Sequence, residues 1–270
     1  MKQDTKNANT FVTVSIVSHG DAKKTKSALE SIQIHEQSHR IQIIVTDNLG
    51  NDLAELDPSP WASLIILRNQ KIMGFAHNHN QAFKLATGKC FCVLNPDILF
   101  IEAIFPHLIE RLEREAAIIS PLIIDSSNTI QDSFREFPTP LSILKRRLPG
   151  YHFTPLPPDE LELIRPDWIA GMFMFMRSES YSELGGFDEK YHLYFEDVDF
   201  CLRARSLDLL IPGRVLPLVD TNLHVQHNAQ RASRKRLRYF LWHIQSAIRF
   251  FTSKVYKDAK KLCERANVVR

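Results

Sequence analysis

The 270-residue chain has the composition of a folded globular protein, with 44% hydrophobic and 24% charged residues. Its longest apolar run, Trp168–Met176, is far shorter than the roughly 20 residues that cross a bilayer, which excludes a transmembrane span. Residues 1–10 are polar and lack the apolar centre of a signal peptide. We therefore expect a flexible N-terminus on a cytoplasmic protein.

The net charge of +3 is unevenly distributed along the chain. Residues 231–270 hold 12 of the 34 basic and 2 of the 31 acidic residues, so this tail carries +10 and the preceding residues −7. A basic tail favours an anionic partner, either phospholipid headgroups or nucleic acid. The basic residues are not interleaved with a recognised RNA or DNA module, which argues against nucleic acid.

The first hundred residues alternate between apolar strands and helices. The predicted elements are strands over Phe11–Ser18, Ile41–Thr46, Ser63–Leu67 and Phe91–Leu94, and helices over Lys23–Ile34 and Gly74–Ala86. This order is typical of a parallel sheet with helices on both faces. Ligands of such sheets bind beyond the carboxyl ends of the strands.

The second half of the chain is less regular. The proline-rich stretch Phe137–Asp167 predicts irregular structure near the active face. After it, the predicted elements are a buried strand over Trp168–Met176, a helix over Ser178–Leu184 capped by its serine, a helix over Phe195–Arg205, short strands over Val215–Val219 and Asn222–Gln226, and a long helix within Lys235–Lys254.

Polar residues follow several of the predicted strands. They form the runs Ser18–Gly20, Asp47–Asn48, Arg68–Asn69 and Asn95–Asp97. A divalent cation that bridges a diphosphate needs only one or two protein carboxylates, which Asp97 would supply. Taken alone, an Asn-Pro-Asp sequence is more often a structural turn.

Three acids, Glu196, Asp197 and Asp199, lie at the predicted start of a helix. They are either simple capping residues, stabilised by the helix dipole, or a functional cluster. The flanking aromatic residues would desolvate them, which raises a carboxyl pKa toward values useful for a general base. Asp197 and Asp199 diverge around a helix, so one can face the cleft while the other pairs with Arg203 or Arg205.

His224 and His227 follow a predicted strand and are each either a structural histidine or a metal ligand. The sequence contains no HExxH, GxSxG, Walker or GxGxxG motif. Metalloprotease, serine hydrolase, nucleoside triphosphatase and dehydrogenase activities therefore lack their usual motifs.

Taken together, the segments resemble family-2 glycosyltransferases of the GT-A fold. The similarity rests on VSHG (Val17–Gly20), TDN (Thr46–Asn48), GFAHNHNQA (Gly74–Ala82), LNPD (Leu94–Asp97), WIAGMFMFMR (Trp168–Arg177) and GGFDEKYHLYFEDVDFCLR (Gly185–Arg203). The resemblance implies an α/β domain over residues 11–230, with a Rossmann-like nucleotide-sugar half (11–100), an acceptor half (101–230) and a mixed central sheet. Residues 231–270 would form a basic, amphipathic helical tail.

Within the family, the chain is most similar to bacterial rhamnosyltransferases that act on polyprenyl-diphosphate-linked N-acetylglucosamine. This finer likeness rests on REFP (Arg135–Pro138), on the R-x-S motif at Arg231–Ser233 and on the W-H-x-x-S motif at Trp242–Ser246. It implies dTDP-β-L-rhamnose as donor and a role in O-antigen or cell-surface polysaccharide synthesis. The enzyme would be peripheral on the inner face of the bacterial cytoplasmic membrane. Another nucleotide-sugar, linked to UDP or GDP, stays open as the donor.

The resemblance also implies roles for individual residues. Asp197 would be the base of an inverting transfer. The donor would be bound by Ser18, His19, Gly20, Asp47, Asn80, Asn95 and Asp97. The acceptor would be bound by Trp168, Gly171 and Glu196, and Gly171 would leave room for a sugar. The cation, Mg²⁺ or Mn²⁺, would be held by Asn95, Asp97 and His224, with His227 as the alternative to His224.

Asn95 departs from the Asp-x-Asp motif that the family usually has. An amide oxygen ligates a divalent cation without contributing charge, so we expect weak affinity for the free metal. The metal would then arrive with the nucleotide-sugar.

The tail predicts one amphipathic helix. Its apolar stripe comprises Leu237, Phe240, Leu241, Ile244, Ala247, Ile248 and Phe251, widened by Tyr239, Trp242 and Phe250. Such a stripe packs either on the protein core or on a membrane surface, with the basic residues on anionic headgroups.

Overall fold

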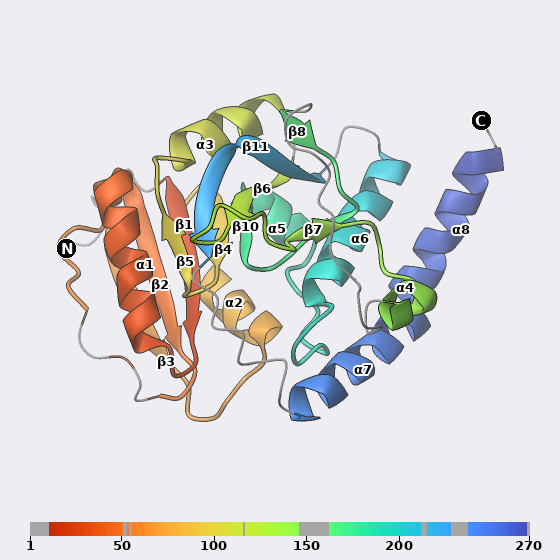
Figure 1. Ribbon diagram of the computed structural model, residues 1–270, viewed down its shortest axis with the longest axis horizontal. Coiled ribbons are helices and arrows are strands. Elements are labelled where there is room, and N and C mark those ends of the chain that lie inside the picture. Colours follow the sequence, from red (N-terminus) through yellow and green to blue (C-terminus); the bar gives the residue numbers. More distant parts are fainter. Residues whose placement is uncertain are drawn as a thin grey trace.

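The computed structural model describes residues 11–50, 53, 56–115, 117–145, 162–211, 215–227 and 237–268. The predicted flexible segment 1–10 and the basic residues 231–236 lie outside these ranges. A mixed sheet with the strand order β3-β2-β1-β4-β10-β6-β11-β5 crosses the molecule (Figure 1). The sheet confirms the predicted α/β class.

The elements are as follows. The strands are β1 (Val12–Ser18), β2 (Ile41–Asp47), β3 (Ser63–Arg68), β4 (Cys90–Leu94), β5 (Ile98–Phe100), β6 (Ala117–Ile124), β7 (Phe134–Arg135), β8 (Leu163–Ile164), β9 (Trp168–Ile169), β10 (Phe173–Arg177) and β11 (Leu216–His227). The helices are α1 (Ala22–His35), the 3-10 helix η2 (Ser38–Arg40), α2 (Phe75–Phe83), α3 (Phe105–Arg114), α4 (Pro140–Lys145), α5 (Ser178–Glu183), α6 (Glu196–Leu210), α7 (Leu237–Thr252) and α8 (Lys254–Val268).

The first half of the fold forms as the sequence predicts. Strands β1 to β4 run parallel, and β1 lies between β2 and β4. Because Ser18 is in register with Asp47 and Ile16 with Leu94, the residues that follow these strands meet at one edge of the sheet.

The predicted strand Trp168–Met176 is wrong as a single element. Strand β9 pairs with β7 in a separate small sheet, whereas β10 lies antiparallel between β4 and β6. The strand is interrupted at residues 170–172, where the backbone turns and the N–H of Phe173 donates to the carbonyl of Ala170. An apolar run does not reveal such a break, since both pieces are buried.

The two short strands expected over Val215–Gln226 are one strand, β11. Its pairing with β6 jumps from Asp220 opposite Pro121 to His224 opposite Leu122. This irregularity keeps both parts in the sheet while it changes which face the later side chains occupy.

Two further expectations needed correction. Helix α4 and strand β8 lie inside the stretch predicted to be irregular, of which residues 146–161 are outside the described ranges. Ser178 does not cap α5 with its side chain; its hydroxyl instead donates to the carbonyl of Gly88.

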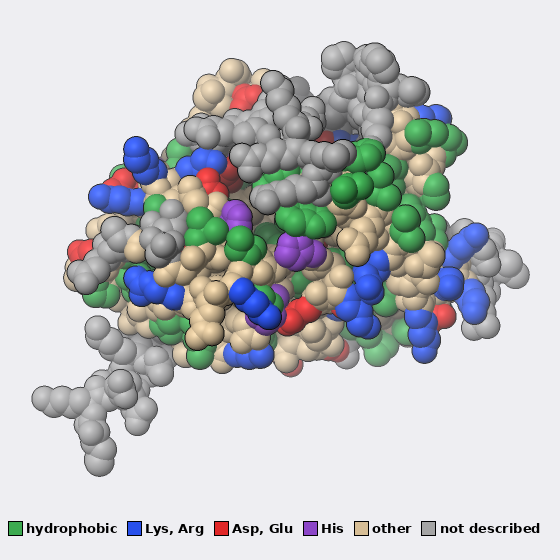
Figure 2. All heavy atoms as spheres, turned by 90° about the horizontal axis from the view of Figure 1, so that it is seen from below, with side chains coloured by type: hydrophobic (Ala, Val, Ile, Leu, Met, Phe, Trp, Pro, Cys, Tyr) green, Lys and Arg blue, Asp and Glu red, His purple; other side chains and the backbone are tan. Residues whose placement is uncertain are grey.

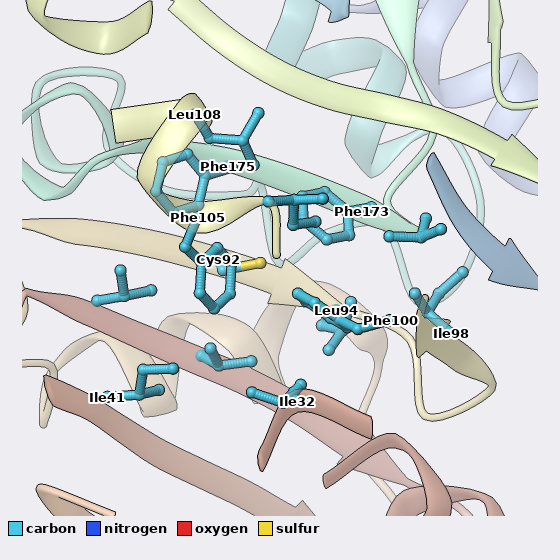
Figure 3. Packing of buried hydrophobic residues seen from close by; sticks show 14 of the residues in the cluster. Ile32, Ile41, Cys92, Leu94, Ile98, Phe100, Phe105, Leu108, Phe173 and Phe175 are labelled. Carbon is cyan, nitrogen blue, oxygen red and sulfur yellow. The ribbon is translucent and has the colours of Figure 1, made fainter. Parts of the chain in front are cut away.

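Apolar side chains alternate between the two faces of β4. Cys90 and Cys92 enter one buried cluster and Phe91 and Val93 the other, as expected for a strand covered on both sides. Figure 3 shows Cys92 among Leu94, Phe173 and Phe175. The cysteines of β4 are free and buried, and burial raises the thiol pKa of Cys90 to about 11, so both behave as core residues.

Helices α7 and α8 pack beside α6 at one end of the molecule (Figure 1). The predicted apolar stripe does not coincide with the buried side of α7. Phe250 and Ser246 are buried against the body, whereas Phe240, Leu241 and Ile248 are exposed. No helix in the described ranges is long and apolar enough to cross a membrane.

Candidate functional site

Polar residues after β1 and β2 form a strand-end cluster: Ser18, His19, Gly20, Asp47 and Asn48. The backbone N–H of Asn48 donates to the carbonyl of Ser18, so the two strand ends are locked together. Gly20 has a φ of +80°, a left-handed conformation that glycine adopts without strain and that turns the chain toward α1. These residues therefore lie at one edge of the sheet.

Asp47 holds the loop that follows β2. Its carboxylate accepts hydrogen bonds from the backbone N–H groups of Leu49, Gly50 and Leu53. The side chain is fully buried, so its charge shapes this loop from within. A role in donor binding stays a prediction, and the loop it organises is the surface through which it would act.

An amide network joins the ends of β1, β2 and β3 to α2. Asn48 Nδ2 lies 3.2 Å from His19 Nδ1, and its Oδ1 accepts from Met73 N and from Asn69 Nδ2. Asn69 also donates to Asn78 Oδ1 at 2.8 Å. Asn69 belongs to a polar run that follows a predicted strand, whereas the sequence analysis gave no individual role to Asn78, which lies within α2.

Two predicted ligand-binding side chains use their polar atoms within the protein. Asn80 accepts from the Tyr181 hydroxyl and the N–H of Phe187, and donates to the carbonyl of Phe187. Trp168 Nε1 donates to the carbonyl of Glu136. In this structure Asn80 therefore ties α2 to the loop after α5, and Trp168 anchors the small sheet.

Asp97 lies next to two basic side chains. Its Oδ1 is 3.4 Å from His227 Nε2, and its Oδ2 is 3.8 Å from Lys24 Nζ. Burial opposes ionisation, but His227 and Lys24 outweigh it and hold the pKa of the Asp97 carboxyl below its usual value. Asp97 is therefore an anion at neutral pH. Lys24, on α1, is a residue that the sequence analysis missed.

His224 and His227 do not share a site. The backbone N–H of His224 donates to Glu102 Oε1 at 2.6 Å, whereas the side chain of His227 is beside Asp97. Residues three apart in a strand point to opposite faces, so only one of the pair can meet Asp97. The structure therefore places the alternative, His227, beside Asp97 and corrects the expectation for His224.

The surroundings of Asp97 fit a weakly held divalent cation. Asp97 Oδ1 and His227 Nδ1 are buried and have no hydrogen-bond partner among the described residues. No group of three or more acidic, histidine or cysteine ligands occurs in the described part of the chain. One carboxylate and one imidazole, with Asn95 nearby in sequence, suit a cation whose remaining ligands are phosphate and water oxygens.

The break between β9 and β10 connects Asn95 to Asp197. The carbonyl of Met172 accepts from the N–H of Asn95 at 2.9 Å, while the N–H of Gly171 donates to Asp197 Oδ2 at 3.0 Å. The chain thus brings the two acidic motifs together through adjacent residues. A Cβ at Gly171 would meet the ring of Phe75 at 2.8 Å, so the glycine makes room for Phe75, and room for a sugar beside it stays a prediction.

Burial controls the two carboxyl groups at the start of α6. It raises the pKa of Asp197, although hydrogen bonds from Gly171 and Val198 partly stabilise the anion. Burial, and then the charge of Asp197, raise the pKa of Glu196, whose Oε2 has no hydrogen-bond partner in the described chain. Each oxygen of Asp197 accepts one backbone hydrogen bond and keeps lone-pair capacity for an incoming hydroxyl.

Residues Leu193–Asp197 form an acidic turn with an unusual backbone. Tyr194 and Phe195 have φ values of 72° and 70°, a region that costs non-glycine residues about 1–3 kcal/mol each. Helix α7 supports the turn: Ser246 Oγ donates to the carbonyl of Leu193, and the rings of Phe250 and Phe195 lie 5.4 Å apart. The C-terminal helices therefore hold Asp197 in place from behind.

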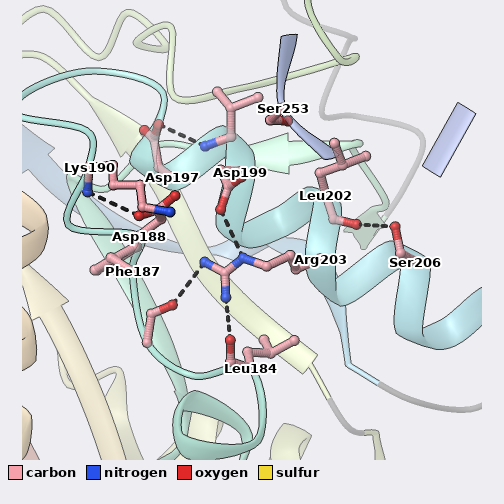
Figure 4. A network of polar contacts seen from close by, with 12 residues as sticks. Leu184, Phe187, Asp188, Lys190, Asp197, Asp199, Leu202, Arg203, Ser206 and Ser253 are labelled. Carbon is pink, nitrogen blue, oxygen red and sulfur yellow. Dashed lines mark hydrogen bonds and ion pairs between the residues drawn. The ribbon is translucent and has the colours of Figure 1, made fainter. Parts of the chain in front are cut away.

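Asp199 points away from the turn. It is buried and pairs with Arg203 at 2.8 Å, which confirms one of the two predicted partners. Figure 4 shows Arg203 reaching back to the backbone of the loop after α5, where its guanidinium also donates to the carbonyls of Leu184 and Gly186. This network fixes the first turns of α6.

Residues 13–179 match the family model described as glycosyl transferase family 2. The chain belongs to this family. It is therefore a glycosyltransferase, and the mixed sheet is its GT-A fold. The matched region covers the strand-end cluster, Asp97 and Gly171, whereas Asp197 and His227 lie beyond it.

Two curated relatives are rhamnosyltransferases. The chain is 29% identical to rhamnosyltransferase WbbL of Escherichia coli K12 over 256 residues, which cover 90% of this chain and 94% of WbbL. It is 30% identical to N-acetylglucosaminyl-diphospho-decaprenol L-rhamnosyltransferase of Mycobacterium tuberculosis (strain CDC 1551 / Oshkosh) over 153 residues. This second match covers 52% of the chain and 48% of the mycobacterial enzyme.

Solved structures support the fold. S. aureus TarS 1–349 in complex with UDP-GlcNAc has a TM-score of 0.58 at 11% identity, covering 93% of this chain and 70% of that one. Mannosyltransferase PcManGT from Pyrobaculum calidifontis, in complex with GDP-Man and Mn2+, has a TM-score of 0.51 at 14% identity, covering 96% and 75%.

Proposed function

We propose that this chain is an inverting rhamnosyltransferase that moves L-rhamnose from dTDP-β-L-rhamnose to a lipid-diphosphate-linked N-acetylglucosamine. The geometry that carries the proposal is the link through Gly171 and Met172, which joins the backbone of Asn95, two residues before Asp97, to the buried carboxylate of Asp197. The choice of rhamnose and of the acceptor rests on the names of the relatives.

Asp197 acts as the general base. Its carboxylate takes the proton of the acceptor hydroxyl as the hydroxyl oxygen attacks C1 of the donor sugar. The bond between C1 and the phosphate oxygen breaks, and the nucleoside diphosphate leaves with the bonding electrons. Because attack and departure are in line, the configuration at C1 inverts. The raised pKa of Asp197 makes its carboxylate a stronger base than an exposed aspartate.

Lys24 stabilises the leaving diphosphate. Its ammonium group lies beside Asp97, so positive charge is already present where negative charge develops. Asp97 and His227, with the Asn95 amide, would hold Mg²⁺ or Mn²⁺. When bound, this cation would neutralise charge on the diphosphate oxygens.

The strand-end cluster binds the nucleotide. The Ser18–Gly20 turn and the loop organised by Asp47 lie at the carboxyl ends of parallel strands, where α/β sheets take their ligands. The amide network around Asn48 keeps this edge rigid before the donor arrives, so little ordering entropy is lost on binding.

The enzyme works at the inner face of the cytoplasmic membrane, where a lipid-linked acceptor is found. Phe240 and Leu241 of α7 are exposed apolar residues, and Lys254 and Lys257 of α8 are exposed lysines. Figure 2 shows hydrophobic side chains beside lysine and arginine side chains at this end of the molecule. This combination suits an anionic lipid surface.

The test is a transfer assay. Radiolabelled dTDP-rhamnose and a synthetic prenyl-diphosphate N-acetylglucosamine are incubated with the enzyme and Mn²⁺, with UDP- and GDP-sugars as competing donors. We expect labelled lipid product from dTDP-rhamnose and none when Mn²⁺ is replaced by a chelator. Product from a UDP- or GDP-sugar alone would overturn the donor assignment, and absence of a thermal shift with dTDP, UDP and GDP would contradict nucleotide binding.

A further inference from the structure

An apolar groove runs between α4 and α7. It has a volume of about 440 Å³, within the range of about 300–1,000 Å³ that small-molecule sites occupy. Its walls are Pro140, Ile143 and Leu144 of α4 and His243, Ile244, Ala247, Ile248, Phe251 and Thr252 of α7. The groove is therefore built almost entirely from hydrocarbon.

The rims of this groove are solvent-exposed. Leu144 is 63% and Ile248 is 60% exposed, and no described residue covers them. The opposite face of α7, with Ser246 and Phe250, already packs on the body. An exposed apolar concavity of this kind marks a binding surface.

The groove adjoins the acidic turn. His243 and Phe251 line it, and their rings also lie 5.4 Å and 6.4 Å from the ring of Phe195. Phe195 precedes Asp197 by two residues and is itself in the left-handed turn. A ligand in the groove therefore contacts the residues that support the turn carrying the base.

We propose that this groove binds the hydrocarbon chain of the lipid-diphosphate-linked acceptor, an inference that rests on the proposed function. An isoprenoid is a flexible, methyl-branched hydrocarbon without hydrogen-bonding groups, which matches an apolar groove. Lys145 and Arg249 are exposed on the same two helices and provide positive charge for the diphosphate at the end of such a chain.

The shape of the site favours a single chain over the bilayer as the occupant. A bilayer contacts a convex apolar face, as Phe240 and Leu241 provide on α7, and gains nothing from a second wall. The groove has two walls, from α4 and α7, which surround a chain on both sides. Its proximity to the acidic turn would place the sugar end of the acceptor toward Asp197.

The first experiment measures binding without catalysis. Farnesyl diphosphate and methyl diphosphate are titrated into the full chain by calorimetry, in detergent-free buffer and below the concentration at which farnesyl diphosphate aggregates. We expect farnesyl diphosphate to bind at least about tenfold more tightly, because only its chain is removed from water. Equal affinities would overturn the proposal.

Two variants and a matched control locate the effect. Ile248→Asp places a charge in the groove and Ile248→Trp fills it, whereas Leu241→Asp places the same charge on α7 outside the groove. Both positions, Ile248 and Leu241, are exposed enough for the fold to persist, which circular dichroism checks. We expect both Ile248 variants to lose the preference for farnesyl diphosphate and Leu241→Asp to keep it. If all three variants lost the preference for farnesyl diphosphate, this face of α7 would be a general lipid-contact surface, and the proposal that the groove binds the chain would be overturned.

A transfer assay separates this inference from the proposed function. With N-acetylglucosamine diphosphate carrying a farnesyl or a methyl group, we expect Ile248→Asp to raise the KM for the farnesyl acceptor about tenfold and leave kcat and the methyl acceptor unchanged. Chain-dependent binding without any transfer would refute the proposed function and leave the groove intact. Transfer that does not depend on chain length would refute the groove alone.

Discussion

The strand-end cluster and the acidic turn are held in different ways. In the first, Asp47 and Asn48 have several hydrogen-bond partners within the neighbouring loops. In the second, Glu196 keeps a buried oxygen without a hydrogen-bond partner among the described residues, and the strained residues Tyr194 and Phe195 pack against helix α7. The fold thus orders the proposed nucleotide-binding edge through hydrogen bonds and supports the proposed base through packing against helix α7.

This difference separates binding from chemistry. A saturated polar edge is rigid and binds a ligand with little reorganisation. A desolvated carboxylate on a strained turn keeps a raised pKa, but it depends on every contact that holds the turn in place. Changes near the acidic turn should therefore lower turnover before they lower nucleotide affinity.

The largest expected effect comes from Asp197→Asn. The amide has nearly the same shape but takes no proton, so we expect transfer to fall by about 10²–10⁴-fold. The dissociation constant for dTDP, measured by calorimetry, should stay close to the wild-type value because the strand-end cluster is untouched. Wild-type turnover in this variant would remove Asp197 from the mechanism.

Asp97→Ala and His227→Ala should have the next largest effect. Each removes a group of the candidate cation site, and we expect Mn²⁺-dependent donor binding to weaken by about 10–100-fold. His224→Ala is the matched control: its side chain lies beside Glu102, so donor binding should be unchanged. If His224→Ala weakened donor binding and His227→Ala did not, the expectation from the sequence that His224 meets the metal would be restored.

Removing the support behind the acidic turn should uncouple rate from binding. Phe250→Ala deletes a fully buried ring and should cost about 3–5 kcal/mol of unfolding free energy, together with roughly tenfold in kcat. Ser246→Ala loses one hydrogen bond, worth about 1 kcal/mol. Phe240→Ala, exposed on the same helix, serves as the control and should change neither quantity. A fall in dTDP affinity that parallels the fall in kcat would argue against this separation.

The smallest effect concerns Glu196→Gln. Because the folded pKa of Glu196 is raised above its ordinary 4.5, the folded state holds a proton that the unfolded state releases, and stability falls as pH rises through that interval. Glutamine removes this dependence, so the variant should be more stable than the wild type at high pH by about 1 kcal/mol. Denaturant melts at several pH values measure it, and an unchanged pH slope would count against a buried, protonated Glu196.

The same contrast explains what the sequence could predict. Strands β1 to β4 follow from alternating apolar runs and turn residues, and the strand-end cluster follows from their parallel order. The break at Gly171 lies within a continuous apolar run, and positive φ values at Tyr194 and Phe195 contradict the preference of both residue types. The choice of His227 over His224 depends on a register shift in β11. These features arise from tertiary packing, which no local pattern encodes.

The most direct test of the account is the pH dependence of kcat/KM for transfer, measured for the wild type and for Asp197→Asn. Burial raises the pKa of Asp197 above its ordinary 3.8, and the base works only when ionised. The account predicts that wild-type kcat/KM falls about tenfold per pH unit on the acid side, with a midpoint above 3.8, and that this acid limb is absent from the residual activity of Asp197→Asn. The same acid limb in both proteins would contradict the assignment of Asp197 as the base.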